Sequence, residues 1–484
     1  MPCSIRITTL AAGCWSWRAA TCSGSCVRCR PERHGRWPRQ SVGRLVSWSG
    51  KFSADLWLRQ PAPGAVVAFA LAMAVATDVQ PLRAQEPEDF TPTTIIHAQV
   101  NTAMGALSFE GDVVDRGSNT ALGFPLLNAL SVNHDARVTI DTSFTGQDLL
   151  RVRFRSGNFG ASGFFSNPPT PLTRLDFASD NPISVNRAYL QVPLSPELRI
   201  SVGGIISQLD KLPVWPSVYN DSPILDLFQY AGAPGAYSKR SGGGFGAWWQ
   251  PRGVLQGFSL GYAYVAERAG GSPQGGGLFS PVSSQTSTLQ LALTRPQWNI
   301  TGAYTFSGPQ VRLRGTPLAS LLAAGARDGS LQSWSVAGYW QPRRSRWIPS
   351  ISVGLGQDSF RFGAYPVANV SGLRTQSWYT GLVWSDVLRQ GNSLGFAVGS
   401  PAHVTGIQAS GTRPIDDRGL AYELYYRIVV SDELSLTPAV FWLTRPRGAM
   451  TASDDPSQAL LFPVGSTDAT LGVWAGLIRA TLRF

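Results

Sequence analysis

Residues 470–484 read TLGVWAGLIRATLRF, and they alternate between apolar and polar side chains up to the last residue. In a strand, the apolar members would share one face and the polar members the other: Trp474, Ile478, Leu482 and Phe484 against Arg479, Thr481 and Arg483. A period of two is the pattern of a β-strand whose two faces meet different surroundings. We therefore expect the chain to end in a strand with one apolar face and one charged face.

The same alternation occurs in earlier segments. It is strict in Leu150–Arg155, and it recurs in Arg137–Phe144, Trp298–Phe306 and Leu420–Val430. Because lipid offers no hydrogen-bond partners, a sheet can cross a membrane only as a closed barrel. Its strands alternate lipid-facing apolar residues with lumen-facing polar ones. The pattern predicts an all-β fold, a transmembrane antiparallel β-barrel over residues 136–484, with Phe484 as the signal that the barrel-assembly machinery reads.

The alternating segments predict about sixteen strands, a number that we expect to hold to within two. They lie at 136–144, 149–157, 171–178, 183–192, 198–206, 243–249, 257–266, 286–294, 298–306, 331–340, 348–357, 377–384, 393–398, 420–430, 434–443 and 470–484. An even number of strands places both ends of the chain on the periplasmic side, where turns are short, and leaves the long loops outside.

Composition and charge exclude other classes of protein. Only 15% of the 484 residues are charged, and no apolar run reaches the length of a spanning helix. The net charge of +11 belongs mostly to residues 1–84, which contribute +8, so we expect no nucleic-acid partner. All five cysteines lie in the first 29 residues. Cys22, Cys26 and Cys29 have a C-x3-C-x2-C spacing, which resembles the cluster-binding loop of radical enzymes. That interpretation requires a βα-repeat barrel in the following sequence, and the sequence shows no such pattern.

An export signal is expected at residues 51–84. Lys51 and Arg59 precede a 14-residue apolar core, GAVVAFALAMAVAT at 64–77, and cleavage is expected after Ala84. The alternative is that 64–77 forms a buried helix. Residues 1–50 are interpreted as an unstructured leader or a stretch upstream of the true start codon. Residues 85–135 are interpreted as a periplasmic N-terminal segment ahead of the barrel.

A barrel of sixteen strands leaves an aqueous channel unless something narrows it. The long segment 207–242 is rich in aromatic residues, and we expect it to fold inward as a constriction loop whose apolar residues pack on the wall. Its expected site residues are Asp210, Trp215, Tyr219, Asp221, Asp226 and Tyr230, with the three carboxylates facing the channel. The opposite wall would carry Arg137, Arg151, Arg153, Arg155, Arg174 and Arg187.

Arginines facing carboxylates across a narrow bore would set up a transverse field that orients polar solutes and filters ions. The alternative is that these arginines form structural ion pairs or sit at strand ends. Catalysis is not expected, because the four histidines show no metal-ligand spacing and no phosphate-binding loop follows a strand. We expect no metal and no cofactor. A barrel lipase would need a Ser/His pair on the outer wall, and His403 is interpreted as a loop residue.

Several stretches resemble the cyanobacterial outer-membrane porins of the iron-uptake type, which are related to the OprB carbohydrate-selective porins. The resemblance covers about residues 93–484 and rests on 140–158, 172–177, 212–237 with 247–250, 392–401 and 421–446; LPVWPSVYNDSPILDLFQYAGAPGAY at 212–237 is the most distinctive. It implies a homotrimer of barrels that passes ions and small hydrophilic solutes, with a link to iron uptake. Such porins usually carry a wall-anchoring domain and a coiled coil ahead of the barrel, and neither is visible here.

We therefore expect an outer-membrane porin, surrounded by lipid, that lets inorganic ions and small hydrophilic solutes diffuse passively. The alternatives are a channel selective for carbohydrates or iron species, and a barrel enzyme without conductance.

Overall fold

The computed structural model describes residues 91–110, 114–115, 120–121, 130–160, 170–175, 181–219, 224–271, 275–280, 282–310, 312–325, 328–343, 347–363, 370–409, 411–450 and 472–484. The expected leader (1–50) and signal peptide (51–84) lie outside these residues.

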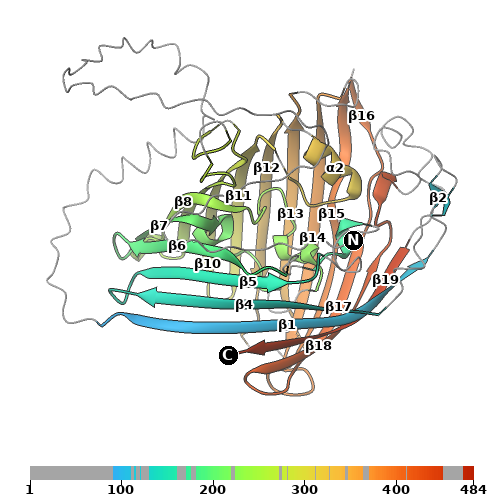
Figure 1. The fold of residues 1–484 in the computed structure, drawn as a ribbon. Helices are drawn as coiled ribbons and strands as arrows, with labels where there is room; N and C mark the ends of the chain where they lie inside the picture. Colours follow the sequence, from blue (N-terminus) through green and yellow to red (C-terminus); the bar gives the residue numbers. More distant parts are fainter. Residues whose placement is uncertain are drawn as a thin grey trace, which may run out of the picture. The chain divides into compact units, whose positions relative to one another are not determined.

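One antiparallel sheet closes on itself to form a barrel (Figure 1). Its strands are β1 (Thr93–Glu110), β4 (Ser131–Ser143), β5 (Leu149–Gly157), β6 (Ser184–Pro193), β7 (Leu198–Ser207), β8 (Ser241–Trp249), β9 (Phe258–Ala266), β10 (Gln285–Arg295), β11 (Trp298–Gly308), β12 (Ser330–Trp340), β13 (Ser350–Arg361), β14 (Gly372–Ser385), β15 (Ser393–Ala409), β16 (Gly411–Pro414), β17 (Ala421–Val429), β18 (Leu434–Leu443) and β19 (Gly472–Arg483). The short β16 pairs only with β15, so sixteen strands form the wall and confirm the expected fold class.

The barrel closes where the last strand meets the first. β19 pairs with β1 over twelve residue pairs, from Gln99 opposite Arg483 to Glu110 opposite Gly472, and β1 pairs in turn with β4. Every wall strand therefore has a neighbour on both sides, and no row of backbone groups is left unpaired at an edge.

The first strand corrects the sequence analysis. β1 lies within the segment 85–135 that was expected to precede the barrel, and β4 begins at 131 rather than 136. Many residues of β1 are small or weakly polar, as in NTAMGALS at 101–108, so the contrast between its two faces is low. Pairing with β19, far along the chain, fixes this strand, and a local pattern does not record that contact.

The expected strand at 171–178 is also wrong. Residues Pro171–Thr173 form a 3-10 helix, and Leu175 makes a single bridge to Leu225. Leu172 and Leu175 are buried inside the barrel, so their spacing reflects packing against other inward segments and not a membrane-facing strand. The number sixteen was therefore reached with one strand missed and one added.

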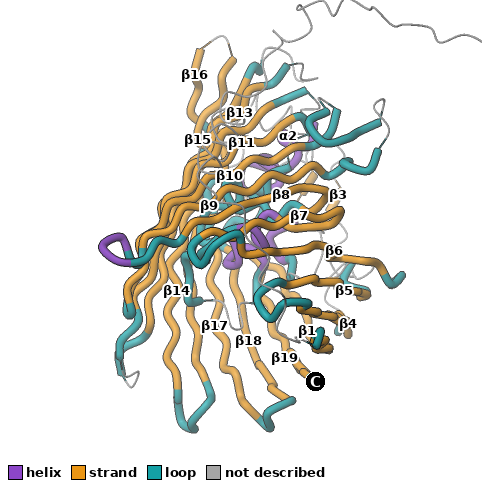
Figure 2. Tube along the Cα trace, turned by 90° about the vertical axis from the view of Figure 1, so that its left-hand side faces the viewer, coloured by secondary structure: helices purple, strands orange, loops and turns teal. Residues whose placement is uncertain are grey.

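The connections differ between the two ends of the barrel (Figure 2). At one end, which we call the short-turn end, the longest connection is 341–349 and the shortest is 296–297. The other end, the long-loop end, carries connections such as 208–240 and 309–329. The turns expected at 295–297, 341–347 and 431–433 all lie at the short-turn end. Among the described residues, no helix is long and apolar enough to span a membrane.

The outer face of the wall is apolar and the inner face is polar. On β10, Leu289 and Leu291 point outward and are 42% and 46% exposed. Thr288 and Gln290, which alternate with them along the strand, point inward and are buried. Aromatic rings stack on the outer face, with 5.1 Å between the ring centres of Trp442 and Trp474. This is the arrangement expected of a barrel whose exterior meets lipid.

Candidate functional site in the barrel interior

Residues 208–219 and 224–240, the described part of the expected constriction loop between β7 and β8, fold inward from the long-loop end. The loop contains the 3-10 helices η4 (Gln208–Lys211) and η5 (Asp226–Tyr230). Its large side chains Tyr219, Phe228, Tyr230 and Tyr237 are each at most 1% exposed. Because such burial removes much apolar surface from water, these rings hold the loop in place without any regular sheet pairing.

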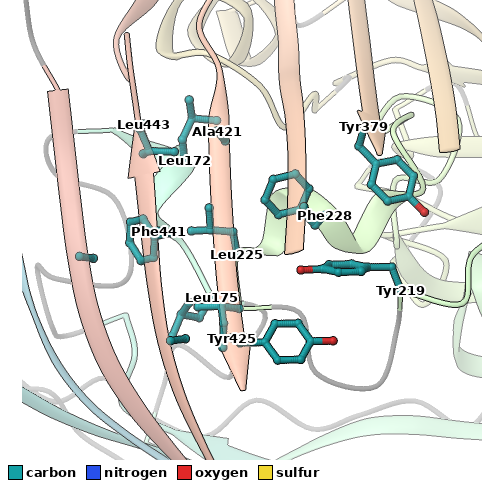
Figure 3. Packing of buried hydrophobic residues seen from close by; sticks show 14 of the residues in the cluster. Leu172, Leu175, Tyr219, Leu225, Phe228, Tyr379, Ala421, Tyr425, Phe441 and Leu443 are labelled. Atoms are coloured by element: carbon teal, nitrogen blue, oxygen red, sulfur yellow. The ribbon is translucent and has the colours of Figure 1, made fainter. Parts of the chain in front are cut away.

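Glu423 on β17 anchors the middle of the constriction loop. Its Oε1 accepts hydrogen bonds from the Tyr219 hydroxyl at 2.9 Å and from the backbone N–H of Ile224 at 3.0 Å. Its Oε2 accepts the N–H of Leu225 at 2.7 Å. Tyr219 also packs against Tyr425 and Phe228 (Figure 3). A buried carboxylate is retained only where donors satisfy it, and these three donors come from described residues of the loop.

The loop backbone is fixed to a second stretch of the wall. Ser377 on β14 donates to the carbonyl of Gly232 at 2.7 Å, and Thr305 on β11 donates to that of Ala236 at 2.8 Å. At Gly354 on β13, a Cβ atom would lie 1.9 Å from the carbonyl oxygen of Ala231, so only glycine admits the loop this closely. The loop thus covers the inner wall from β7 to β17, because η4 also packs against β7, β8 and β9.

Two further segments fold into the same interior. The 170–175 segment packs Leu172 and Leu175 into the cluster that contains Phe441 and Leu443 of β18 (Figure 3). The helix α2 (Pro317–Gly325) packs against the inner faces of β12 to β15 through a cluster that includes Leu318, Leu322 and Phe360. Each segment covers part of the wall, and the inner faces of β4 to β6 remain partly exposed.

Arginines line that partly exposed face, which we call the basic wall: Arg137 on β4, Arg151, Arg153 and Arg155 on β5, and Arg187 on β6. Register brings them together, because Arg155 lies opposite Arg137 and Arg153 lies opposite Arg187. Four of these side chains are only 15–26% exposed.

Most of the basic wall is paired with carboxylates. Asp135, whose side chain is fully buried, contacts Arg137 at 2.8 Å and Arg155 at 2.6 Å. Asp141 binds Arg151 through both oxygens, each at 2.7 Å. Arg187 pairs with Asp210 of the constriction loop. Structural pairing, the alternative weighed from the sequence, therefore describes four of these five arginines.

Three expected site residues lie elsewhere than predicted. Arg174 follows the 3-10 helix of the 170–175 segment and not a wall strand, and its carbonyl accepts the N–H of Asp226. Asp226 does not face the channel: it is 4% exposed and pairs with Arg314 at 2.6 Å and Lys239 at 3.4 Å. Asp210 lies against the basic wall and not opposite it. Buried carboxylates need counter-charges, which spacing along the chain does not reveal.

The remaining loop residues have a packing role or lie outside the described residues. Tyr219 and Tyr230 are buried, and Trp215 packs edge-on against Tyr237 with 5.1 Å between ring centres. Asp221 lies outside the described residues.

Sequence reasoning missed the partners Asp135, Asp141 and Glu423, and it did not count Arg483 among the lining residues. The alternation in 470–484 had already placed Arg483 on the polar face of the closing strand. Arg483 contributes to a hollow of about 310 Å³ at the short-turn end, whose lining also includes Thr139, Arg151 and Arg153. Phe484 pairs through its backbone with Ala98 of β1, and its side chain is 69% exposed.

The interior shows little that resembles a catalytic site. The described residues contain no group of three or more His, Cys, Asp or Glu that could hold a metal ion. His403 lies on β15 and not in a loop, and its Nδ1 is 3.1 Å from Ser400 Oγ. Both residues are buried, at 5% and 3% exposure, so this pair does not meet the outer-wall requirement of a barrel lipase.

Comparison with known proteins gives the family. The model of the OprB family of carbohydrate-selective porins matches residues 99–481. An uncharacterized protein from Synechocystis is 28% identical over 395 residues, which are 74% of this chain and 66% of the relative. Another from Nostoc is 24% identical over 355 residues, which are 66% of this chain and 58% of the relative. The chain thus spans less than two thirds of the length of either relative.

Among solved structures, OprB of Pseudomonas putida aligns with a TM-score of 0.49 at 10% identity, covering 81% of this chain and 94% of that one. An anion-selective porin from Comamonas acidovorans aligns with a TM-score of 0.46 at 10% identity, covering 81% and 100%. Because the family model matches most of the sequence, including both strands that close the barrel, the chain belongs to the OprB porin family of the outer membrane.

Proposed function

We propose that this porin lets inorganic ions and small hydrophilic solutes diffuse through a bore bounded by the constriction loop and the basic wall. The observation that carries the proposal is the one-sided arrangement of the interior. The constriction loop covers β7 to β17, whereas Arg137, Arg151, Arg155 and Arg187 stay partly exposed on β4 to β6. Polar groups left partly exposed on one inner face are what a water-filled passage requires.

The short-turn end is proposed to face the periplasm, after export through a cleaved signal at residues 51–84. Barrels of this chain are proposed to assemble as homotrimers.

Conductance of the purified protein in a planar bilayer tests the main proposal. We expect ohmic single-channel steps and swelling of liposomes in small sugars, with rates that fall as the sugar grows. A protein that folds and inserts but carries no current would contradict it.

A carbohydrate-selective channel is a second candidate, because the family is described as carbohydrate-selective. Liposome swelling separates the two: a selective channel passes one sugar much faster than another of equal size, whereas a general pore ranks solutes by size alone. Ferric and ferrous salts in the same assay test the expected link to iron uptake.

A further inference from the structure

One arginine of the basic wall has no carboxylate partner among the residues that the structure describes. Arg153 donates from Nε to the Thr139 hydroxyl at 3.0 Å, and no carboxylate of the described residues lies within ion-pair distance of it. Its two terminal nitrogens make no hydrogen bond within the described part of the chain. A guanidinium whose two terminal nitrogens have no partner presents two parallel N–H donors at a fixed spacing.

The surroundings of Arg153 carry excess positive charge. The hollow at the short-turn end is lined by Arg137, Arg151, Arg153 and Arg483. Asp141 also lines it, but Arg151 engages both of its oxygens. The four arginines therefore outnumber the one acidic side chain among the described residues that line the hollow.

We propose that this hollow is a binding subsite for small oxyanions, meaning solutes that carry a phosphate or carboxylate group. The inference rests on the proposed function, because the solute must reach the bore. The two terminal nitrogens of Arg153 would hold two oxygens of the anion, and Arg483 on the other side of the hollow would supply the second charge. Charged hydrogen bonds of this kind are stronger than neutral ones and favour planar or tetrahedral oxyanions over chloride.

Size and additional donors fit the same class of ligand. A hollow of about 310 Å³ lies at the lower end of the range for small-molecule sites, so it admits inorganic phosphate or a sugar phosphate. Gln99 and His97 of β1 also line it and offer an amide and an imidazole to sugar hydroxyls. The position at the short-turn end means that a solute would meet the subsite at that mouth of the bore.

Block of the channel current tests the subsite on the purified full-length protein. Inorganic phosphate, glucose 6-phosphate and glucose are added separately to a planar bilayer in potassium chloride, and the concentration that halves the current is measured. We expect at least one anion to block and glucose to have no such effect. Arg153→Gln should raise the half-blocking concentration about tenfold, because it removes a charged donor pair.

Two variants separate the subsite from general charge and from folding. Arg199→Gln removes an exposed arginine near the same end that does not line the hollow, and it should shift the half-blocking concentration less than twofold. Arg153→Lys keeps the charge without the fork and should fall between wild type and Arg153→Gln. A shift in electrophoretic migration on boiling that equals the shift of the wild type shows that each variant is a folded barrel.

The outcomes are distinct. Block by both anions supports the shared chemistry, and block by glucose 6-phosphate alone supports it with the sugar contributing. A protein that conducts but is blocked by neither anion overturns the subsite and leaves the porin proposal intact. Equal block of wild type and Arg153→Gln also overturns it. A protein that carries no current contradicts the proposed function, and calorimetric titration with phosphate then tests the subsite directly.

Discussion

Glu423 Oε1 lies 2.9 Å from the hydroxyl oxygen of Tyr219, a residue 204 positions earlier in the chain. This bond joins a wall strand to the middle of the constriction loop. The same carboxylate also accepts the backbone N–H groups of Ile224 and Leu225. One buried side chain of β17 therefore anchors the middle of the loop, in addition to the bonds from β11 and β14.

Replacing Glu423 should loosen the constriction loop. We expect Glu423→Ala to lower the free energy of unfolding by about 3 kcal/mol, because three donors lose their acceptor in a buried site. Open-channel current noise should rise as the loop samples more positions. Glu423→Gln retains one carbonyl acceptor and should cost less. Glu433→Gln, in an exposed turn, is the matched control, and equal effects at both positions would contradict the anchoring role.

Removing charge from the basic wall should change ion selectivity. The triple change Arg151→Gln, Arg153→Gln and Arg155→Gln deletes three positive charges from the partly exposed inner face. We expect the preference for anions over cations to fall severalfold, since the bore would no longer concentrate anions. The reversal potential under a salt gradient measures this ratio. An unchanged reversal potential would show that these arginines do not act on permeating ions.

Asp135 is expected to contribute both to the stability of the closed barrel and to the ion selectivity of the channel. Its side chain pairs with Arg137 and Arg155 and accepts a hydrogen bond from Asn101 of β1, which in turn accepts one from Thr481 of β19. Asp135→Asn leaves two arginines without their counter-charge. We expect a loss of about 3 kcal/mol in urea unfolding, at the lower end for a buried pair because both arginines keep some solvent contact.

The same variant should also shift the reversal potential toward greater anion preference, opposite in direction to the arginine triple variant. Asp432→Asn, in an exposed turn, serves as the control for loss of one carboxylate. Destabilisation without any shift in selectivity would restrict Asp135 to a structural role.

A buried carboxylate between long loops should make stability depend on pH. Desolvation by burial raises the pKa of Asp417 to about 6, although Thr316, Val404 and Ala449 donate hydrogen bonds to it. Because this value exceeds the unfolded pKa of 3.8, the folded chain binds the proton more tightly. The stabilising contribution is complete below the unfolded value and is lost as pH rises through about 6.

The free energy of unfolding should thus gain up to about 3 kcal/mol from Asp417 as pH falls from 7 to 4. Urea unfolding followed by tryptophan fluorescence measures it. In Asp417→Asn the gain should disappear, so the difference between the variant and wild type depends on pH. A difference that stays constant from pH 7 to 4 would show that Asp417 does not titrate in this range.

The sequence alone determined the class of fold and most of the strands. The alternation in 470–484, 150–155 and 420–430 records two different environments on the two faces of each strand, and that contrast is local. The inward fold of 207–242 was also predicted, since its aromatic residues would be costly to leave in water. The alternation also predicted that the arginines of β4 and β5 share one face of the sheet.

Tertiary structure decided what the charges do. Asp135, Asp141 and Glu423 find their partners across strand register and across a loop, and no spacing along the chain encodes those contacts. β1 was not predicted as a barrel strand because its two faces differ little, and it is a strand because β19 and β4 supply its hydrogen-bond partners. Carboxylates with little solvent exposure, such as Asp135 and Asp141, form ion pairs with neighbouring arginines. Arg153 has no carboxylate partner among the described residues. The alternation along the sequence indicates whether a side chain faces lipid or the barrel interior. Which side chains form pairs depends on the residues that folding brings together from distant parts of the chain.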